Sequence, residues 1–104
     1  MTGIRIQREA NAYADRRRKY RILVDGEELG AIGRGDTIDI PLDPGRHSVW
    51  MRIDWTGSEM ATFVLEADET IEFVCRPRYP TAAVVVALLR SIKDRDDWIV
   101  LERM

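Results

Sequence analysis

The residues best suited to chemistry form a basic run near the N-terminus, and binding of phosphate groups is the chemistry they would do. The candidate residues are Arg16, Arg17, Arg18, Lys19 and Arg21. Each contact between such a side chain and a phosphate adds a salt-dependent increment of affinity. Only Tyr13 and Tyr20 are near enough to stack on bases, and no RNA-binding motif is recognisable. Two readings stay open: an anionic partner, either lipid or nucleic acid, and a solvated loop that pairs with acidic groups of the same chain.

A tryptophan between charged neighbours is the second candidate contact. The alternation of residues 46–55 places Trp50 and Arg52 together on the polar side of a strand. Tryptophan and arginine are enriched at the energetic centres of protein interfaces. We therefore expect Trp50 and Arg52 either to contact a partner or to be covered by a C-terminal helix.

The nucleophiles and metal ligands of the chain do not form a recognisable catalytic set. His47 and Cys75 are the only histidine and cysteine; they are 28 positions apart and belong to no zinc-binding motif. His47 begins a strand beside a turn, and Cys75 falls on the apolar side of a strand, so a structural role is expected for both. The acidic run 94–97 lacks the glycine and the bidentate glutamate of an EF-hand. We predict no enzyme activity, no catalytic residue, no metal, no cofactor and no small-molecule substrate.

These side chains are positioned by segments in which apolar and polar residues alternate, as in half-buried strands. The expected strands are 4–7, 20–24, 28–32, 37–42, 47–55, 61–65, 70–75 and 98–102. Asp25-Gly26 is predicted to be a tight turn with glycine at positive φ, and Thr56-Gly57-Ser58 is predicted to be a second turn. Pro41 cannot donate to a ladder, so its strand is expected at a sheet edge or to end there.

The fold class expected from this pattern is mainly β: an antiparallel β-sandwich of about seven or eight strands with one short C-terminal helix. One domain, 1–104, contains a strand core (1–75) with a basic loop (8–19), followed by a connector, a helix and a final strand (76–104). Prolines make 76–80 a stiff connector, and Thr81 caps a helix over 82–93. That helix is expected to pack on its own sandwich, to form a dimer contact or to insert at a membrane surface.

Charge is distributed unevenly along the chain, although its net value is only −2. Residues 1–21 carry seven basic and two acidic side chains, a net charge of +5, and the remaining residues carry nine basic and sixteen acidic side chains, a net charge of −7. Such asymmetry favours an anionic partner or self-association of a basic arm with an acidic body. The single cysteine and the absence of a secretory signal pattern predict a cytoplasmic location. A peripheral position at the membrane is the alternative.

Residues 24–75 resemble the PEGA domain, a small bacterial β-sandwich module. The shared pattern comprises Val24-Asp25-Gly26, Gly30, the strand Ile38 to Leu42, Pro44-Gly45-Arg46-His47-Ser48-Val49, Phe63-Val64-Leu65 and Asp68-Glu69-Thr70. The resemblance implies a β-sandwich without catalytic activity. We expect a non-catalytic interaction or adaptor domain that acts through protein–protein contact. The alternative is a peripheral binder of anionic lipid or nucleic acid through Arg16 to Arg21.

Overall fold

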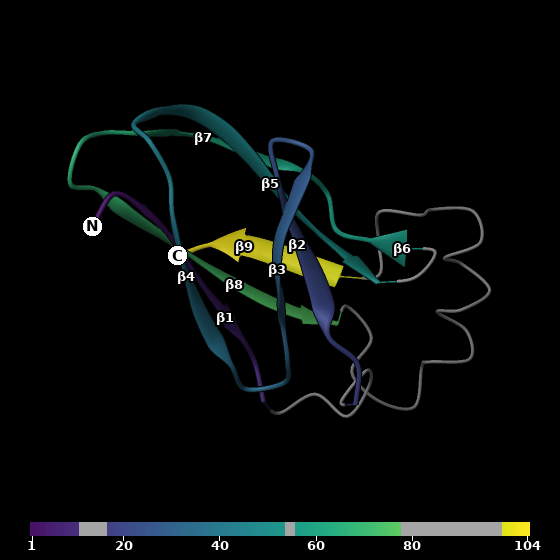
Figure 1. Ribbon diagram of the computed structural model, residues 1–104. Coiled ribbons are helices and arrows are strands. Elements are labelled where there is room, and N and C mark those ends of the chain that lie inside the picture. Colours follow the sequence, from purple (N-terminus) through teal and green to yellow (C-terminus); the bar gives the residue numbers. More distant parts are fainter. Residues whose placement is uncertain (11–16, 54–55, 78–98) are drawn as a thin grey trace.

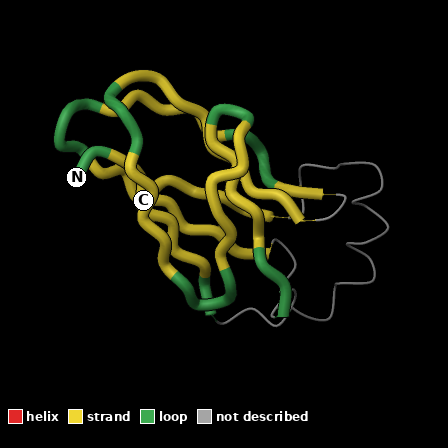
Figure 2. The backbone as a smooth tube through the Cα atoms, in the orientation of Figure 1, coloured by secondary structure: helices red, strands yellow, loops and turns green. Residues whose placement is uncertain are grey.

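Two stacked β-sheets make up the fold. The computed structural model describes residues 1–10, 17–53, 56–77 and 99–104. These residues form nine strands and no helix (Figures 1 and 2). The strands are β1 (Gly3–Arg8), β2 (Tyr20–Val24), β3 (Glu27–Ile32), β4 (Thr37–Pro41), β5 (Gly45–Ile53), β6 (Thr56–Gly57), β7 (Ala61–Leu65), β8 (Thr70–Pro77) and β9 (Ile99–Arg103). The prediction of a mainly β, two-layered fold is confirmed.

The four-stranded sheet has the order β4-β1-β8-β9, and the five-stranded sheet has the order β3-β2-β5-β6, with β7 also paired to β5. The core lies between the sheets because alternate residues of each strand point inward. Ile4 and Ile6 of one sheet, and Ile22 and Met51 of the other, are fully buried. The rings of Phe63 in β7 and Phe73 in β8 connect the layers, with centroids 5.5 Å apart.

One pair of strands departs from the expected antiparallel arrangement. β1 runs parallel to β8, with Ile4 beside Ile71 and Ile6 beside Phe73. The other paired strands in the described part of the chain are antiparallel. Alternation within a strand reports which side is buried but carries no information about the direction of its neighbour, so this pair was not predictable from the pattern.

The predicted tight turn and edge strand are both confirmed. Asp25 and Gly26 have φ values of +53° and +84°, which join β2 to β3 in the hairpin geometry that favours Asp-Gly. β4 lies at the edge of the four-stranded sheet, where the missing N–H of Pro41 is tolerated.

Several strand boundaries differ from the sequence-based expectation. Arg8 was assigned to a loop but continues β1, opposite Cys75. Thr56-Gly57 was assigned to a turn but pairs with Arg52 and Ile53 as β6. Arg76-Pro77 was assigned to a connector but extends β8, because Arg76 and Pro77 lie opposite Val100 and Ile99 of β9.

The final strand is confirmed over Ile99–Arg103. Several other predictions fall outside the described residues: the helix 82–93 with its cap Thr81, the remainder of the connector, Trp98, and the segment 11–16 with Arg16. Within the described ranges, no helix has the length and apolarity needed to cross a membrane.

Candidate functional site

The two groups of residues predicted to contact partners meet on one surface. Inward-facing Ile22 of β2 and Met51 of β5 are buried, so the residues next to them point to the opposite, outer side of the five-stranded sheet. Cross-strand register then places Arg21 opposite Arg52 and Leu23 opposite Trp50. Glu28 of β3 lies opposite Leu23. We call this surface the Trp50 face: Arg21, Leu23, Glu28, Trp50 and Arg52.

The Trp50 face carries more positive charge than its own carboxylate neutralises. Arg21 Nη1 lies 3.7 Å from Glu28 Oε1, a weak exposed ion pair. The Arg52 guanidinium lies 5.7 Å from the centre of the Trp50 ring and makes no ion pair with another described residue. Like charges directly opposite each other on neighbouring strands repel. An anionic group from outside would relieve that repulsion.

Trp50 itself is half-buried on this face. Its indole Nε1 is shielded from solvent and has no hydrogen-bond partner among the described residues. A shielded donor without an acceptor is unfavourable. The indole and the neighbouring Leu23 supply the apolar part of a contact, and the arginines supply the charged part.

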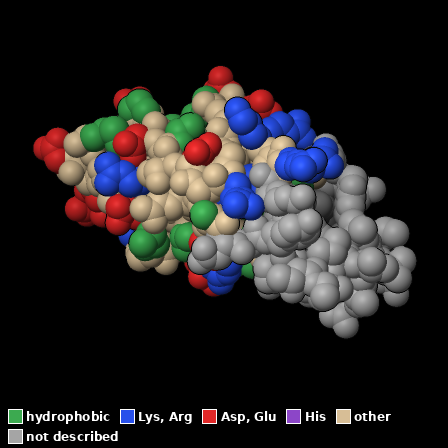
Figure 3. Space-filling view, turned by 90° about the horizontal axis from the view of Figure 1, so that it is seen from below, with side chains coloured by type: hydrophobic (Ala, Val, Ile, Leu, Met, Phe, Trp, Pro, Cys, Tyr) green, Lys and Arg blue, Asp and Glu red, His purple; other side chains and the backbone are tan. Residues whose placement is uncertain are grey.

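The basic run leads directly into this face. Arg17, Arg18 and Lys19 are exposed and immediately precede β2, which begins at Tyr20. Figure 3 shows the largest group of Lys and Arg side chains on one side of the described surface and acidic side chains gathered at the opposite end. On the side of the described surface shown there, basic and acidic side chains are separated in space.

Arg8 is a functional-looking residue that the sequence analysis missed. Only 3% of Arg8 is exposed, its Cζ lies 3.8 Å from the centre of the Tyr20 ring, and Nη1 donates to the Ile32 carbonyl at 3.1 Å. Nη1 also donates to the carbonyl of Arg18. Arg8 thus ties the end of the basic run to β1 and β3. The sequence does indicate this position: Ile4, Ile6 and Arg8 are each two residues apart, so in one strand all three side chains lie on the inward side.

His47 is held by two acceptors. Its Nδ1 lies 2.6 Å from Asp25 Oδ2, and its Nε2 lies 2.7 Å from the Asp43 carbonyl oxygen. A carboxylate and a carbonyl accept but do not donate, so this arrangement favours an imidazole that carries a proton on both ring nitrogens. The hydrogen bond with Asp25 and then that with the Asp43 carbonyl raise the pKa of His47. The same bond, together with the Ser48 N–H, lowers the pKa of Asp25.

The remaining nucleophile is enclosed. Cys75 is fully buried, and burial raises the pKa of its thiol to about 12. The thiol is therefore protonated at neutral pH, which is unfavourable for a nucleophile. Among the described residues, no three His, Cys, Asp or Glu side chains are close enough to hold a metal ion.

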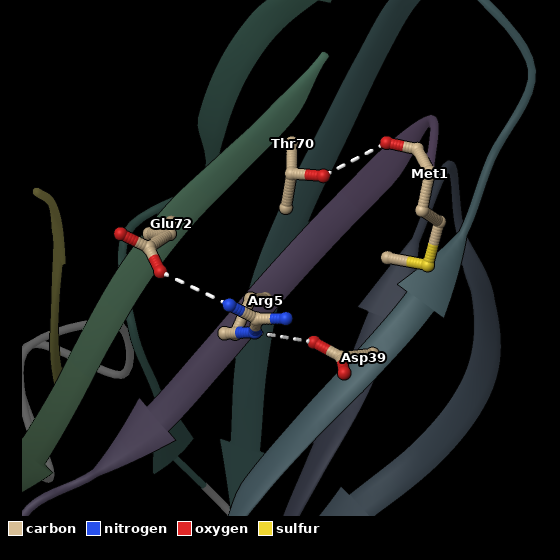
Figure 4. Close-up of polar contacts among 5 residues, drawn as sticks. All are labelled: Met1, Arg5, Asp39, Thr70 and Glu72. Carbon is tan, nitrogen blue, oxygen red and sulfur yellow. Dashed lines mark hydrogen bonds and ion pairs between the residues drawn. The ribbon is translucent and has the colours of Figure 1, made fainter. Parts of the chain in front are cut away.

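The outer side of the four-stranded sheet has the opposite character, because its arginines are paired. Arg5 Nε lies 2.7 Å from Asp39 Oδ1, and Arg5 Nη1 lies 3.5 Å from Glu72 Oε1 (Figure 4). Arg76 makes two bonds of 3.1 Å to the carboxylate of Glu102. On this side each arginine has a carboxylate within the molecule, whereas Arg52 has none among the described residues.

No protein-family model, curated protein or solved structure matches this chain.

Proposed function

We propose that the protein is a non-catalytic interaction domain that binds another protein through the Trp50 face. The observation that carries this proposal is the register that sets Arg21 opposite Arg52 beside Trp50 and Leu23. The sequence placed these side chains in two separate groups; their meeting on one sheet makes a single contact area with an apolar centre and a charged margin.

The composition of the face favours a protein partner. Interface centres are enriched in tryptophan and arginine, and a half-buried indole offers a large contact area at a low cost in side-chain entropy. The paired charges of Arg5 and Arg76 on the other sheet leave that surface less to gain from a partner. The Trp50 face is therefore the better candidate of the two.

The test compares partners retained by the wild-type chain with those retained by two variants. Trp50→Ser combined with Arg52→Ser should lose the partner, whereas Arg5→Ser, on the outer side of the other sheet, should keep it. A captured protein is then purified, and its affinity should fall at least about 30-fold for the double variant, as expected for a hot-spot residue. Equal affinity for all three folded proteins would reject the proposal.

Binding of an anionic lipid or nucleic acid is the second candidate function. It is supported by the exposure of Arg17, Arg18 and Lys19 directly before β2 and Arg21. Flotation with phosphatidylserine vesicles and a gel shift, each at two salt concentrations, measure it. Replacing Arg16, Arg17, Arg18 and Lys19 by serine should abolish a salt-sensitive signal. Binding that survives this replacement would exclude the basic run as its cause.

Within this proposal, the domain is a PEGA-like bacterial module in the cytoplasm, with a membrane-peripheral variant if the second function holds. The PEGA-like assignment is supported by the order and spacing of turn residues in 24–75, including the Asp25-Gly26 turn with φ of +53° and +84°. The location is supported by Cys75 being the only cysteine of the chain.

A further inference from the structure

One sheet edge lacks the features by which proteins protect exposed strands. Edges are commonly protected by proline, by charged residues or by bulges. β4 has Pro41, and β9 has Glu102 and Arg103. β3 begins with two glutamates, and its pairing with β2 is irregular between Ile22 and Leu23. These three edges are therefore poor templates for another strand, and the fourth, β6, is only two residues long.

β7 differs from all three. Its sequence, Ala61-Thr62-Phe63-Val64-Leu65, has no charge and no proline, and its pairing with β5 is regular throughout. Within the described part of the chain, β7 pairs with β5 alone, and no described strand lies along its other edge. Val64 is 58% exposed on the outer side of the sheet, and Thr62 is exposed beside it. An open, uncharged strand of this kind readily pairs with another strand.

We propose that β7 pairs with β7 of a second copy of this chain, antiparallel and with its two-fold axis at Phe63. In that register Phe63 lies opposite its own symmetry mate, and Thr62 lies opposite Val64 of the other copy. The five-stranded sheets of the two copies then form one continuous sheet. This association goes beyond the proposed function because it uses the edge of the sheet and leaves the Trp50 face free.

A second copy fits this edge because the register centred on Phe63 places no like charges opposite each other. Each exposed Val64 meets a Thr62, and each Thr62 meets a Val64, so the same favourable pair occurs twice. The acidic residues that flank β7 do not meet head-on: Glu66 falls opposite Met60, and Glu59 falls opposite Ala67. Like charges directly opposite would have opposed the pairing.

The contact area is small, so the dimer should form and dissociate with concentration. A single pair of five-residue strands buries less surface than a stable, permanent interface does. Sedimentation equilibrium should therefore give a mass near the 12.0 kDa of one chain in dilute solution, rising toward twice that value as concentration increases.

The first test places charges on the edge. Thr62→Lys combined with Val64→Lys sets lysine opposite lysine at both positions and should keep the protein monomeric at every concentration. Leu29→Lys combined with Thr37→Lys is the control: it adds the same charge at exposed positions on the edge strands β3 and β4, and it should dimerise like the wild type. A circular dichroism spectrum establishes that both variants are folded.

The second test determines which residues of the two β7 strands lie opposite each other, and it does not require the lysine variant to fold. Thr62→Cys and Val64→Cys chains are mixed and oxidised with diamide, and the covalent product should contain one chain of each kind. Either variant oxidised alone should give little product, because each cysteine then faces a valine or a threonine. The native Cys75 should not interfere, since it is fully buried.

Four results of these two tests and of the sedimentation measurement would overturn the proposal, and a fifth would come from a variant of the Trp50 face. Two of them concern the dimer itself: a monomer at all concentrations, and a dimer unaffected by the two edge lysines. The third is equal cross-linking of all cysteine combinations. The fourth is a dimer that dissociates in about 0.5 M salt, where exposed charges are screened. That result would indicate association of the basic run with an acidic surface. Loss of the dimer in the Trp50→Ser and Arg52→Ser double variant would equally reject β7 and would assign self-association to the Trp50 face.

Discussion

At the scale of single residues, His47 makes the stability of the protein depend on pH. Its pKa is raised above 6.5 by Asp25 and the Asp43 carbonyl, so the folded protein holds the His47 proton more tightly than the unfolded chain. The stabilisation is fully present below pH 6.5 and is lost as the pH rises through the folded pKa. We expect a loss of about 1 kcal/mol across that window, because Asp25 is half-exposed and its bond is partly screened.

Urea unfolding of the wild type and of His47→Gln between pH 5 and pH 9 measures this effect. The wild type should lose stability on the alkaline side, and the variant should not. Asp25→Asn is the matched control, since it retains an acceptor but removes the carboxylate, and it should reduce the slope. Parallel pH profiles for all three proteins would contradict the doubly protonated state of His47.

Arg8 should contribute to stability through its donors as well as through packing. Arg8→Ala leaves the Ile32 and Arg18 carbonyls without this donor and removes the side chain over Tyr20, so we expect a loss of about 2–4 kcal/mol in unfolding free energy. Arg8→Met keeps much of the apolar contact with Tyr20 and should cost less. Urea midpoints compare the two variants. If Met costs as much as Ala, the apolar contact with Tyr20 contributes little.

Arg8 and His47 show how far the position of a single side chain could be predicted from the sequence. The inward position of Arg8 follows from its parity with Ile4 and Ile6, and its charge is what led to a loop assignment. The contact of His47 with Asp25 could not be predicted, because Asp25 lies on a turn of another hairpin and meets His47 only once β2 and β5 are paired.

At the scale of elements, the junction of β5 and β6 depends on a glycine. A side chain at position 57 would collide with the Met51 carbonyl oxygen, which already accepts from the Ser58 N–H at 2.9 Å. The Ser58 hydroxyl also accepts from the Met51 N–H at 2.8 Å. The pairing that begins with Thr56 thus continues through Ser58, in a segment that the sequence predicted to be a turn.

Gly57→Ala should therefore destabilise the fold by about 1–3 kcal/mol, because the obstacle is backbone and cannot rotate away. Gly26→Ala is a useful comparison: position 26 has open space, and its φ of +84° imposes only the conformational cost of a left-handed residue. Thermal unfolding should rank Gly57→Ala as the more destabilised. The reverse order would show that β6 can move away from β5.

Most elements were predictable because period-two alternation is strong in β2, β4, β5, β7 and β8. The alternation does not predict which strands pair with each other or in which direction they run. Nothing in the sequence assigns β7 and β8, which are consecutive, to different sheets, or makes β1 parallel to β8. For the same reason the Trp50 face could be predicted only in parts: Arg21 and Trp50 were each singled out, but their register across β2 and β5 is a property of the folded sheet.

At the scale of the whole molecule, the two sheets share one hydrophobic core. A substitution that destabilises one sheet should therefore destabilise the other sheet as well. Ile6 of the four-stranded sheet is fully buried in the same cluster as Met51, which neighbours Trp50. Ile6→Ala should cost about 2–5 kcal/mol and should shift the transition seen by tryptophan fluorescence together with that seen by circular dichroism. Separate transitions would mean that the two sheets unfold independently.

The parallel pair of β1 and β8 has a consequence for the order in which the chain can fold as it leaves the ribosome. Arg5 and Glu72, which lie on these neighbouring strands, are 67 positions apart. β1 is synthesised before β8, so its β8 side stays open until Thr70–Pro77 has been translated. Closing so long a loop is slow compared with forming a hairpin. The N-terminal strand must therefore wait, partly paired at most with β4, and its exposed isoleucines during that wait are a natural point of contact for chaperones.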